Sequence, residues 1–209
     1  MINLSNVKEL AVQLNKIYTE QKAYLSQLDS DIGDGDHGVN MARGFNAVVE
    51  ALEKTPPKDI GEAFKSISMS LIKTVGGASG PLYGTFFLKA ALVFAKKTQG
   101  GIDEWIEALD KAIAGIQQIG KAQKGDKTML DIWFPALDSL KASKAAGKSF
   151  DDCLKDSSDA AQEAMKATIP LLAKKGRASY LGERSIGHQD PGATSAAMLL
   201  KAVSEIFVK

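Results

Sequence analysis

The chain has 209 residues, of which 44% are hydrophobic, so it is long enough to bury a core and is expected to form one domain spanning residues 1–209. Its 26 basic and 25 acidic residues give a formal net charge of +1, which excludes a general attraction to nucleic acid or to an anionic membrane. No apolar run reaches the ~18 residues of a membrane span and no signal pattern opens the chain, so a cytoplasmic location is expected. The single cysteine, Cys153, excludes an internal disulfide and is expected to be a buried, unreactive thiol.

Apolar residues recur at intervals of three or four along the chain, which predicts an all-α fold. The first predicted helix runs from Leu4 to Leu28 and ends at an acidic loop. Pro170 is expected to bend the last turns of the seventh helix. Eight helices and no strand are expected, with the later helices centred on residues 39–52, 60–75, 81–94, 105–116, 129–140, 154–169 and 191–207.

The connections between these helices are of two kinds. Short linkers at 56–58, 98–101 and 146–149 indicate that successive helices run antiparallel. The polar, glycine-rich connections follow the first, third, fifth and seventh helices, at 29–40, 76–80, 120–128 and 176–192. In an up-and-down arrangement these connections emerge at the same end, so the sequence predicts a single composite site at one rim of the bundle.

The acidic loop is the most unusual stretch, because residues 28–40 hold four aspartates, three glycines and one of the two histidines. Crowded carboxylates repel one another unless cations neutralise them, and carboxylate oxygens are ligands that Mg²⁺ prefers. Asp34 and Asp36 flank a glycine, and Asp29 can close the site from the end of a helix, whereas Asp31 is the weakest candidate. The spacing does not fit an EF-hand calcium loop. The alternative interpretation is a helix end followed by a solvated acidic turn.

Two further loops suggest contacts with phosphate. The run of glycines around Ser79, just before Pro81, predicts an anion-binding turn at a helix start, with a flexible turn as the alternative. Residues 120–128 resemble a P-loop, but Asp126 interrupts the required Gly-Lys-Ser/Thr order and no strand precedes it, so a P-loop fold is rejected. Thr128 is instead expected to cap a helix, and Lys127 to be a solvated lysine.

The connection at 176–193 is too long and polar for a simple linker, which indicates a lid or binding loop. Arg177 can bind phosphate through its planar guanidinium and is the candidate catalytic residue. An arginine at a helix C-terminus is the alternative interpretation. His188 is expected to be an ordinary loop histidine.

Four ordered motifs together resemble the nucleotide-binding L subunit of dihydroxyacetone kinase. They are Asp29-x4-Asp34-x-Asp36-His37-Gly38-x-Asn40 and the segments 76–84, 125–131 and 176–193. The resemblance covers essentially the whole chain. It implies a closed barrel of eight antiparallel amphipathic helices, with Mg²⁺ and an adenine nucleotide at one end.

The resemblance also implies roles for individual residues. Asp29, Asp34 and Asp36 would hold two Mg²⁺ ions that bridge the phosphates of ADP or ATP. Asp190, Pro191 and Gly192 would close the site as part of the lid. The full set of implied nucleotide contacts is His37, Gly38, Val39, Asn40, Ala78, Ser79, Gly120, Met129, Arg177, Asp190, Pro191 and Gly192.

In this family the dihydroxyacetone is held covalently by a separate K subunit, so neither His37 nor His188 is given that role. A free-standing chain of this length resembles the phosphoenolpyruvate-dependent system, in which bound ADP is recharged by a phosphohistidine M subunit of the phosphotransferase system. Three alternatives stay open. They are a stand-alone subunit of an ATP-dependent kinase for dihydroxyacetone or a related substrate, a Mg²⁺-dependent phosphohydrolase, and a non-catalytic nucleotide-binding regulatory module.

Overall fold

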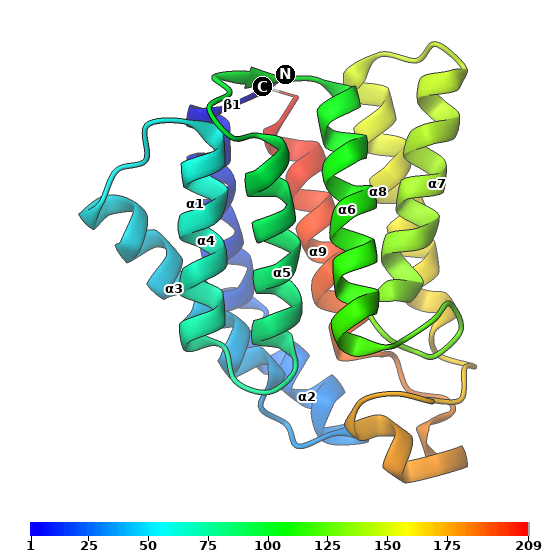
Figure 1. The fold of residues 1–209 in the computed structure, drawn as a ribbon. Coiled ribbons are helices and arrows are strands. Elements are labelled where there is room, and N and C mark those ends of the chain that lie inside the picture. The colour runs from blue at the N-terminus through cyan, green and yellow to red at the C-terminus, as the bar shows by residue number, and fades with distance from the viewer. Residues whose placement is uncertain (209) are drawn as a thin grey trace.

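The computed structural model describes residues 1–208; Lys209, the last residue of the predicted domain, lies outside them. The described residues form nine α-helices, one 3-10 helix and one pair of two-residue strands (Figure 1). The elements are β1 (Ile2–Asn3), α1 (Leu4–Glu20), α2 (Lys22–Ile32), α3 (His37–Lys54), α4 (Ile60–Thr74), α5 (Ser79–Val93), β2 (Gln99–Gly100), α6 (Ile102–Gly120), α7 (Leu130–Ala145), α8 (Phe150–Ala167), η1 (Arg177–Ser185) and α9 (Pro191–Ile206). The predicted predominance of helix is confirmed.

The boundaries correct three expectations. The first predicted helix is broken at Gln21, whose ψ of 6° leaves the helical range, so that α2 lies at the lower end of the bundle (Figure 1). Pro170 does not bend the predicted seventh helix, which is α8, because α8 already ends at Ala167, three residues before this proline. The expectation of no strand was also wrong, because β1 and β2 pair antiparallel over residues too few to produce a periodic pattern.

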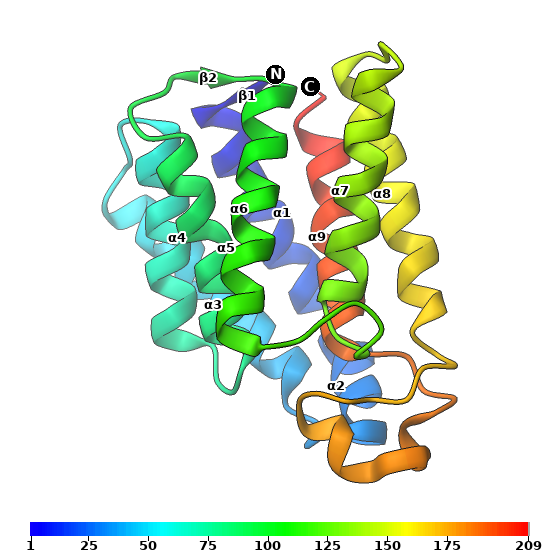
Figure 2. The same ribbon diagram turned by 45° about the vertical axis from the view of Figure 1, so that its right-hand side comes forward.

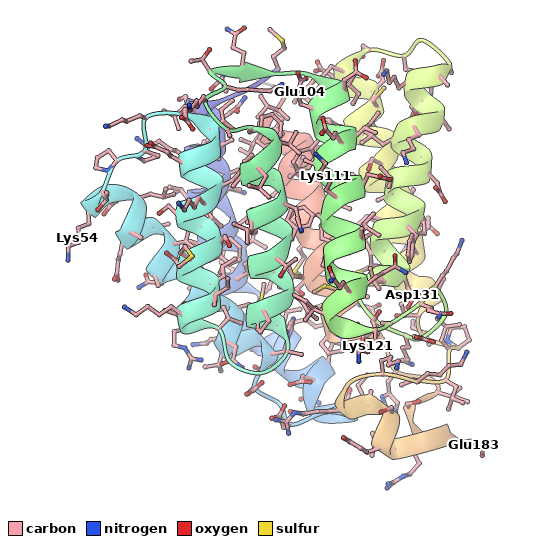
Figure 3. The ribbon with its side chains drawn as sticks, in the orientation of Figure 1. Lys54, Glu104, Lys111, Lys121, Asp131 and Glu183 are labelled. Atoms are coloured by element: carbon pink, nitrogen blue, oxygen red, sulfur yellow. The ribbon has the colours of Figure 1, made fainter. Side chains whose placement is uncertain are left out.

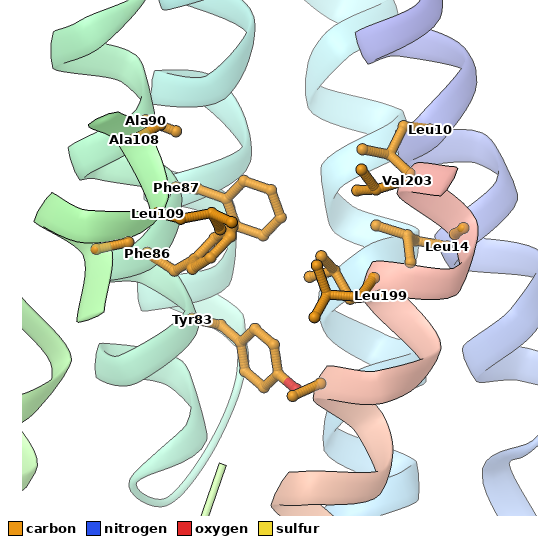
Figure 4. Packing of buried hydrophobic residues seen from close by; sticks show 14 of the residues in the cluster. Leu10, Leu14, Tyr83, Phe86, Phe87, Ala90, Ala108, Leu109, Leu199 and Val203 are labelled. Atoms are coloured by element: carbon orange, nitrogen blue, oxygen red, sulfur yellow. The ribbon is translucent and has the colours of Figure 1, made fainter. Parts of the chain in front are cut away.

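The helices pack as a continuous series of neighbours. Each helix from α3 to α9 contacts the next along the chain, α9 also contacts α1, and α1 contacts α3. Side chains from opposite sides meet in the middle: Phe86, Phe87 and Leu109 face Leu14 and Leu199 (Figure 4). Burying each such side chain contributes roughly 1.5–3 kcal/mol. One apolar core therefore holds the helices of the described chain together.

The two ends of this bundle differ. At one end the N-terminal ammonium donates to the carbonyl oxygen of Phe207 at 3.3 Å, and β1 pairs with β2 (Figure 1). The connections after α2, α4, α6 and α8 lie at the other end, together with η1 (Figure 2). Figure 3 shows Lys121 and Asp131 near this second end, with Glu183 on η1, whereas Glu104 lies at the first. The four polar connections thus share one rim, as the sequence predicts.

The length and polarity of the helices and the burial of the single cysteine bear on two further expectations. Within residues 1–208, the helices are all too short or too polar to span a bilayer. Cys153 is free and buried, so its predicted burial is confirmed, and burial raises the pKa of its thiol.

Candidate functional site

A cleft at this rim is lined by residues from all four polar connections. Most of the predicted site residues line it: Asp29, Asp34, Asp36, His37, Ala78, Ser79, Met129, Arg177, Asp190, Pro191 and Gly192. The others do not. Gly38 packs against the carbonyl of Lys22, Val39 is 48% exposed, Asn40 accepts a hydrogen bond from Arg43, and Gly120 is the last residue of α6.

Three of the four aspartates of the acidic loop converge. Asp29 stands in the last turns of α2, and the loop before α3 brings Asp34 and Asp36 back to it, so that one oxygen of each lies within 4.8 Å of the others. Asp31, the weakest candidate, is outside this group and accepts a hydrogen bond from Gln27 at 2.9 Å. The structure therefore brings the three predicted carboxylates together, and Asp31 lies outside the cluster, as predicted.

The position of Asp29 is fixed by backbone. Its Oδ2 accepts hydrogen bonds from the N–H groups of Asp36 at 2.9 Å and His37 at 3.1 Å. Burial raises the pKa of the Asp29 carboxyl, the charges of Asp34 and Asp36 raise it further, and the two N–H groups oppose this shift. A cation held by the three carboxylates would remove the repulsion.

Two glycines make this loop possible. A methyl group on Gly33 would lie 2.2 Å from Oδ1 of Asp29, well inside contact distance. Gly35 has a φ of 77°, in the left-handed region that other residues rarely adopt. The two glycines therefore allow the backbone of the loop to pass close to the Asp29 carboxylate.

Arg177 reaches the same group of carboxylates from the far side of the cleft. Its Nη2 lies 2.9 Å from Oδ2 of Asp34, and its side chain is 64% exposed. Arg177 is the first residue of η1, while α8 ends at Ala167, so the alternative of an arginine at a helix C-terminus is wrong. The guanidinium faces the place where the three carboxylates would hold a cation.

A buried polar chain supports the other side of the cleft. Nδ1 of His37 lies 3.2 Å from Oγ of Ser79, and its Nε2 lies 2.9 Å from Oγ of Ser195. Tyr83 places its hydroxyl 2.6 Å from the same Ser195 oxygen, pointing from α5 towards α9 (Figure 4). Burial lowers the pKa of His37 to about 4, so the imidazole is neutral near pH 7 and acts as a hydrogen-bonding link.

Sequence reasoning missed this chain of side chains. Tyr18 extends it by donating to the carbonyl of Ser195 at 2.9 Å, across 177 positions of sequence. The one local sign is that Tyr83 follows Ser79 by four positions, which places both on one face of α5. Nothing in the sequence pattern singles out Ser195.

Asp190 differs from its predicted place in the lid. It is the N-cap of α9, where its Oδ2 accepts from the N–H of Ala193 at 2.7 Å, and Pro191 and Gly192 form the first turn. Burial raises the pKa of the Asp190 carboxyl to about 7, and Lys127 opposes the shift. These three residues line the cleft as the N-cap and first turn of α9, and so do not belong to the loop before it.

The connection at 120–128 differs most from the prediction, because the side chain of Lys127 is buried. The expectation of a solvated lysine was wrong. Thr128 is not the N-cap of α7 either: Met129 takes that position, although the Thr128 hydroxyl still accepts from the N–H of Leu130 at 3.2 Å. His188 lies outside the lining of the cleft, with Nδ1 3.8 Å from Asp31, as expected of an ordinary loop histidine.

A family model described as the DAK2 domain matches residues 31–205. The chain belongs to this family. The ADP-binding subunit DhaL of the PEP-dependent dihydroxyacetone kinase of Escherichia coli is 46% identical to this DAK2 domain, covering 90% of each chain. The corresponding PTS-dependent subunit of Lactococcus lactis is 44% identical, covering 99% of each.

Solved structures give the same family. The dihydroxyacetone kinase of C. freundii superposes with a TM-score of 0.74 at 28% identity, over 98% of this DAK2 domain and 35% of that longer chain. The same kinase in complex with AMP-PNP and Mg²⁺ superposes with a TM-score of 0.73. The resemblance to the L subunit of dihydroxyacetone kinase is therefore confirmed.

Proposed function

We propose that this chain is the ADP-binding subunit of a phosphoenolpyruvate-dependent dihydroxyacetone kinase. Its bound ADP would be phosphorylated by a phosphohistidine M subunit of the phosphotransferase system. The phosphoryl group would then pass to dihydroxyacetone held on a K subunit, giving dihydroxyacetone phosphate. The observation that carries the proposal is the convergence of Asp29, Asp34 and Asp36 opposite Arg177, in a chain that is 46% identical to a subunit named for ADP binding.

The residues present fit Mg²⁺. Three carboxylates with oxygens within 4.8 Å of one another are a donor set for a hard divalent cation, and phosphate oxygens would complete octahedral coordination. Mg²⁺ bound there would neutralise the charge on the phosphate oxygens during transfer. We propose two ions, on the strength of the resemblance to the L subunit.

The proposed nucleotide contacts are of two kinds. Residues that line the cleft would bind directly: His37, Ala78, Ser79, Met129, Arg177, Asp190, Pro191 and Gly192. Gly38 and Val39 would contribute backbone N–H groups at the start of α3, where a helix favours anions. Asn40 and Gly120 lie outside the lining of the cleft and would support the nucleotide site indirectly. Asn40 packs on Gly76, and Gly120 ends α6.

In the proposed reaction the chain itself positions groups and moves no proton. Asp29 is held by two N–H groups, and neutral His37 holds the Ser79 hydroxyl at the start of α5. The Arg177 guanidinium would stabilise charge on the phosphoryl group in transit. Positioning and charge neutralisation are the main requirements of phosphoryl transfer.

The proposal extends to architecture and location. We assign residues 1–209 to a single domain that binds ADP and Mg²⁺. Its helices α1 and α3 to α9 would be the eight helices of the closed barrel, with α2 as an extension that carries Asp29. A cytoplasmic location is proposed because ADP and the phosphotransferase partners of the reaction are found there.

The alternatives have weaker support. A phosphohydrolase needs a group that activates water, but His37 is held between Ser79 and Ser195, and His188 lies outside the cleft lining. A regulatory module without transfer activity would be recognised by failure of the reconstituted reaction. An ATP-dependent subunit would be recognised by exchange of its nucleotide.

The protein purified without added nucleotide is expected to carry ADP that survives extensive dialysis. The cleft draws on four connections and lies beside η1, so release requires several contacts to break together, which makes dissociation slow. Denaturing the protein and identifying the released nucleotide tests this. Reconstitution with the K subunit, driven either by phosphoenolpyruvate with the phosphotransferase proteins or by free ATP, then identifies the phosphoryl donor. Empty protein that turns over only with ATP would replace the present proposal with the ATP-dependent one.

Replacing Gly33 with alanine is expected to weaken Mg²⁺ binding by about tenfold or more, because the new methyl group must displace the Asp29 carboxylate. Titration with Mg²⁺ in the presence of ADP measures the effect. Gly101→Ala is the matched control, since a methyl group there meets only Oε2 of Glu104, at 3.7 Å. Equal affinities in the two variants would contradict the placement of the metal at Asp29.

A further inference from the structure

Lys127 makes an unusual set of contacts for a buried lysine. Its ammonium donates hydrogen bonds to the carbonyl oxygens of Ile169 at 3.3 Å, Leu171 at 3.0 Å and Ser185 at 2.6 Å. The residue is 1% exposed. Burial lowers the pKa of the ammonium, so these contacts must compensate for lost hydration.

The three carbonyls belong to the two ends of one segment. Ile169 and Leu171 follow the end of α8, and Ser185 is the last residue of η1. We call residues 168–187 the rim loop. Its two ends are also joined directly, because Gly187 donates to the carbonyl of Ile169 at 2.8 Å and the N–H of Ala173 donates to the Ser185 hydroxyl at 3.0 Å. Lys127 therefore sits at the neck of a loop that begins and ends in the same place.

The backbone around Lys127 is built to point it inward. Its φ is 61°, in the left-handed region. Both oxygens of Asp131 accept from backbone of this connection, Oδ1 from Gly125 and Oδ2 from Thr128. The carbonyl of Asp126 accepts from Lys174 of the rim loop at 3.0 Å. The connection between α6 and α7 is thus a rigid bracket for the neck.

An ammonium has three N–H groups, and carbonyl oxygens accept all three here. Lys127 borders the cleft, but it has no donor left for a phosphate. Its hydrogen bonds are all with neutral backbone of the rim loop, although its charge also acts on the Asp190 carboxyl. The contribution of this lysine to the site is therefore made through the loop.

The tip of the rim loop has weaker attachments. There Ala178 packs on Ile32 of α2, with Leu181 beside it. The ion pair between Arg177 and Asp34 is largely exposed, and such pairs contribute little to stability. The neck is therefore the stronger anchor of the segment that carries Arg177.

We propose that Lys127 is a positioning residue that locks the neck of the rim loop and so holds Arg177 opposite the three carboxylates; its role in transfer rests on the proposed function. Loss of the ammonium would leave the carbonyls of Leu171 and Ser185 without a donor, so the two ends of the loop would be joined only by the bonds of Gly187 and Ala173 and would separate more readily. Asp29 would keep its position, because the N–H groups of Asp36 and His37 hold its carboxylate independently of Lys127.

The test compares Lys127→Met with Lys124→Met, an exposed lysine of the same connection. Amide hydrogen exchange in the free protein is expected to accelerate roughly 10- to 100-fold within residues 168–187 of Lys127→Met, and to stay unchanged in Lys124→Met. A third variant, Leu140→Ala, lowers stability from a buried position elsewhere and controls for general loosening. Unchanged exchange in the rim loop, or acceleration spread evenly along the chain, would overturn the proposal.

The functional arm separates positioning from general damage. In the reconstituted reaction, Lys127→Met is expected to lose about tenfold or more in transfer rate while its Mg²⁺ affinity stays within about twofold of the wild type. Equal losses in rate and in Mg²⁺ affinity would overturn a positioning role. If the reconstituted system shows no phosphoryl transfer at all, the proposed function fails, whereas the exchange result on the free protein still decides the role of Lys127 at the neck.

The contacts of Lys127 can also be tested by NMR on the wild-type protein, where the folding of a variant is not a concern. The ¹⁵N-labelled ammonium of Lys127 is expected to give a sharp NMR signal whose protons exchange slowly with water, since all three are held by buried carbonyls. Ammonium protons that exchange as fast as those of Lys124 would overturn the proposal.

Discussion

The Arg177→Ala variant is expected to slow phosphoryl transfer by about 10² to 10⁵, a range typical of an arginine that stabilises the transferring group. Its guanidinium lies 2.9 Å from Asp34 in the free protein, at the edge of the proposed metal site. ADP affinity is expected to fall much less, because the other lining residues and the three carboxylates remain. Single-turnover transfer from the phosphorylated nucleotide to the K subunit measures the rate, and calorimetry measures the affinity.

Two comparisons sharpen this experiment. Arg184→Ala removes an exposed arginine of η1 that lies beyond the kink at Gly182, and it is expected to leave transfer unchanged. Arg177→Lys should recover only part of the rate, because an ammonium cannot reproduce the planar, bidentate contact of a guanidinium. Near-normal turnover of the alanine variant would reduce Arg177 to a surface cation.

Asp36→Asn is expected to weaken Mg²⁺-dependent ADP binding by more than about 100-fold, since even groups that only support a metal ligand change affinity 10–100-fold. Helical content should be unchanged. In the absence of metal the variant is expected to be as stable as the wild type or more so, because one of three mutually repelling carboxylates is neutralised. Calorimetric titration of ADP at fixed Mg²⁺ and thermal unfolding without Mg²⁺ are the two measurements.

Asp34→Asn should lose metal affinity to a similar extent, but it also removes the partner of Arg177, so its effect on transfer is compound. Asp31→Asn is the control, since Asp31 stands in the last turn of α2, outside the cluster, and is hydrogen-bonded to Gln27. Undiminished Mg²⁺-dependent affinity in both cluster variants would exclude the proposed metal site.

Local patterns were sufficient for the helices and for the shared rim. Apolar spacing predicted the helical fold. Because the polar connections follow every second predicted helix, they were also predicted to meet at one end. The same spacing failed at Gln21, because Leu25 and Leu28 resume the apolar period after the break, as they would in one continuous helix. The roles of individual residues at the rim stay predictions until the variants above are measured.

Contacts between distant parts of the chain were beyond local reasoning. The spacing around Lys127 predicts a turn and a helix start. The side chain is buried because its ammonium binds carbonyl oxygens of residues more than forty positions away. Similarly, Ser195 meets His37 across 158 positions and Tyr83 across 112. Such polar networks are specified by packing of whole helices, and a pattern of neighbours in sequence does not describe them.

The adjacency of the two ends of the chain, at the pole away from the cleft, makes the fold suited to circular permutation. The Met1 ammonium already bonds the Phe207 carbonyl, so a short peptide would join the ends without moving a helix. New ends opened in the exposed turn at Gly147, between α7 and α8, would lie at that same pole. A tether or a fused domain attached there would leave the rim free for the proposed K and M subunits.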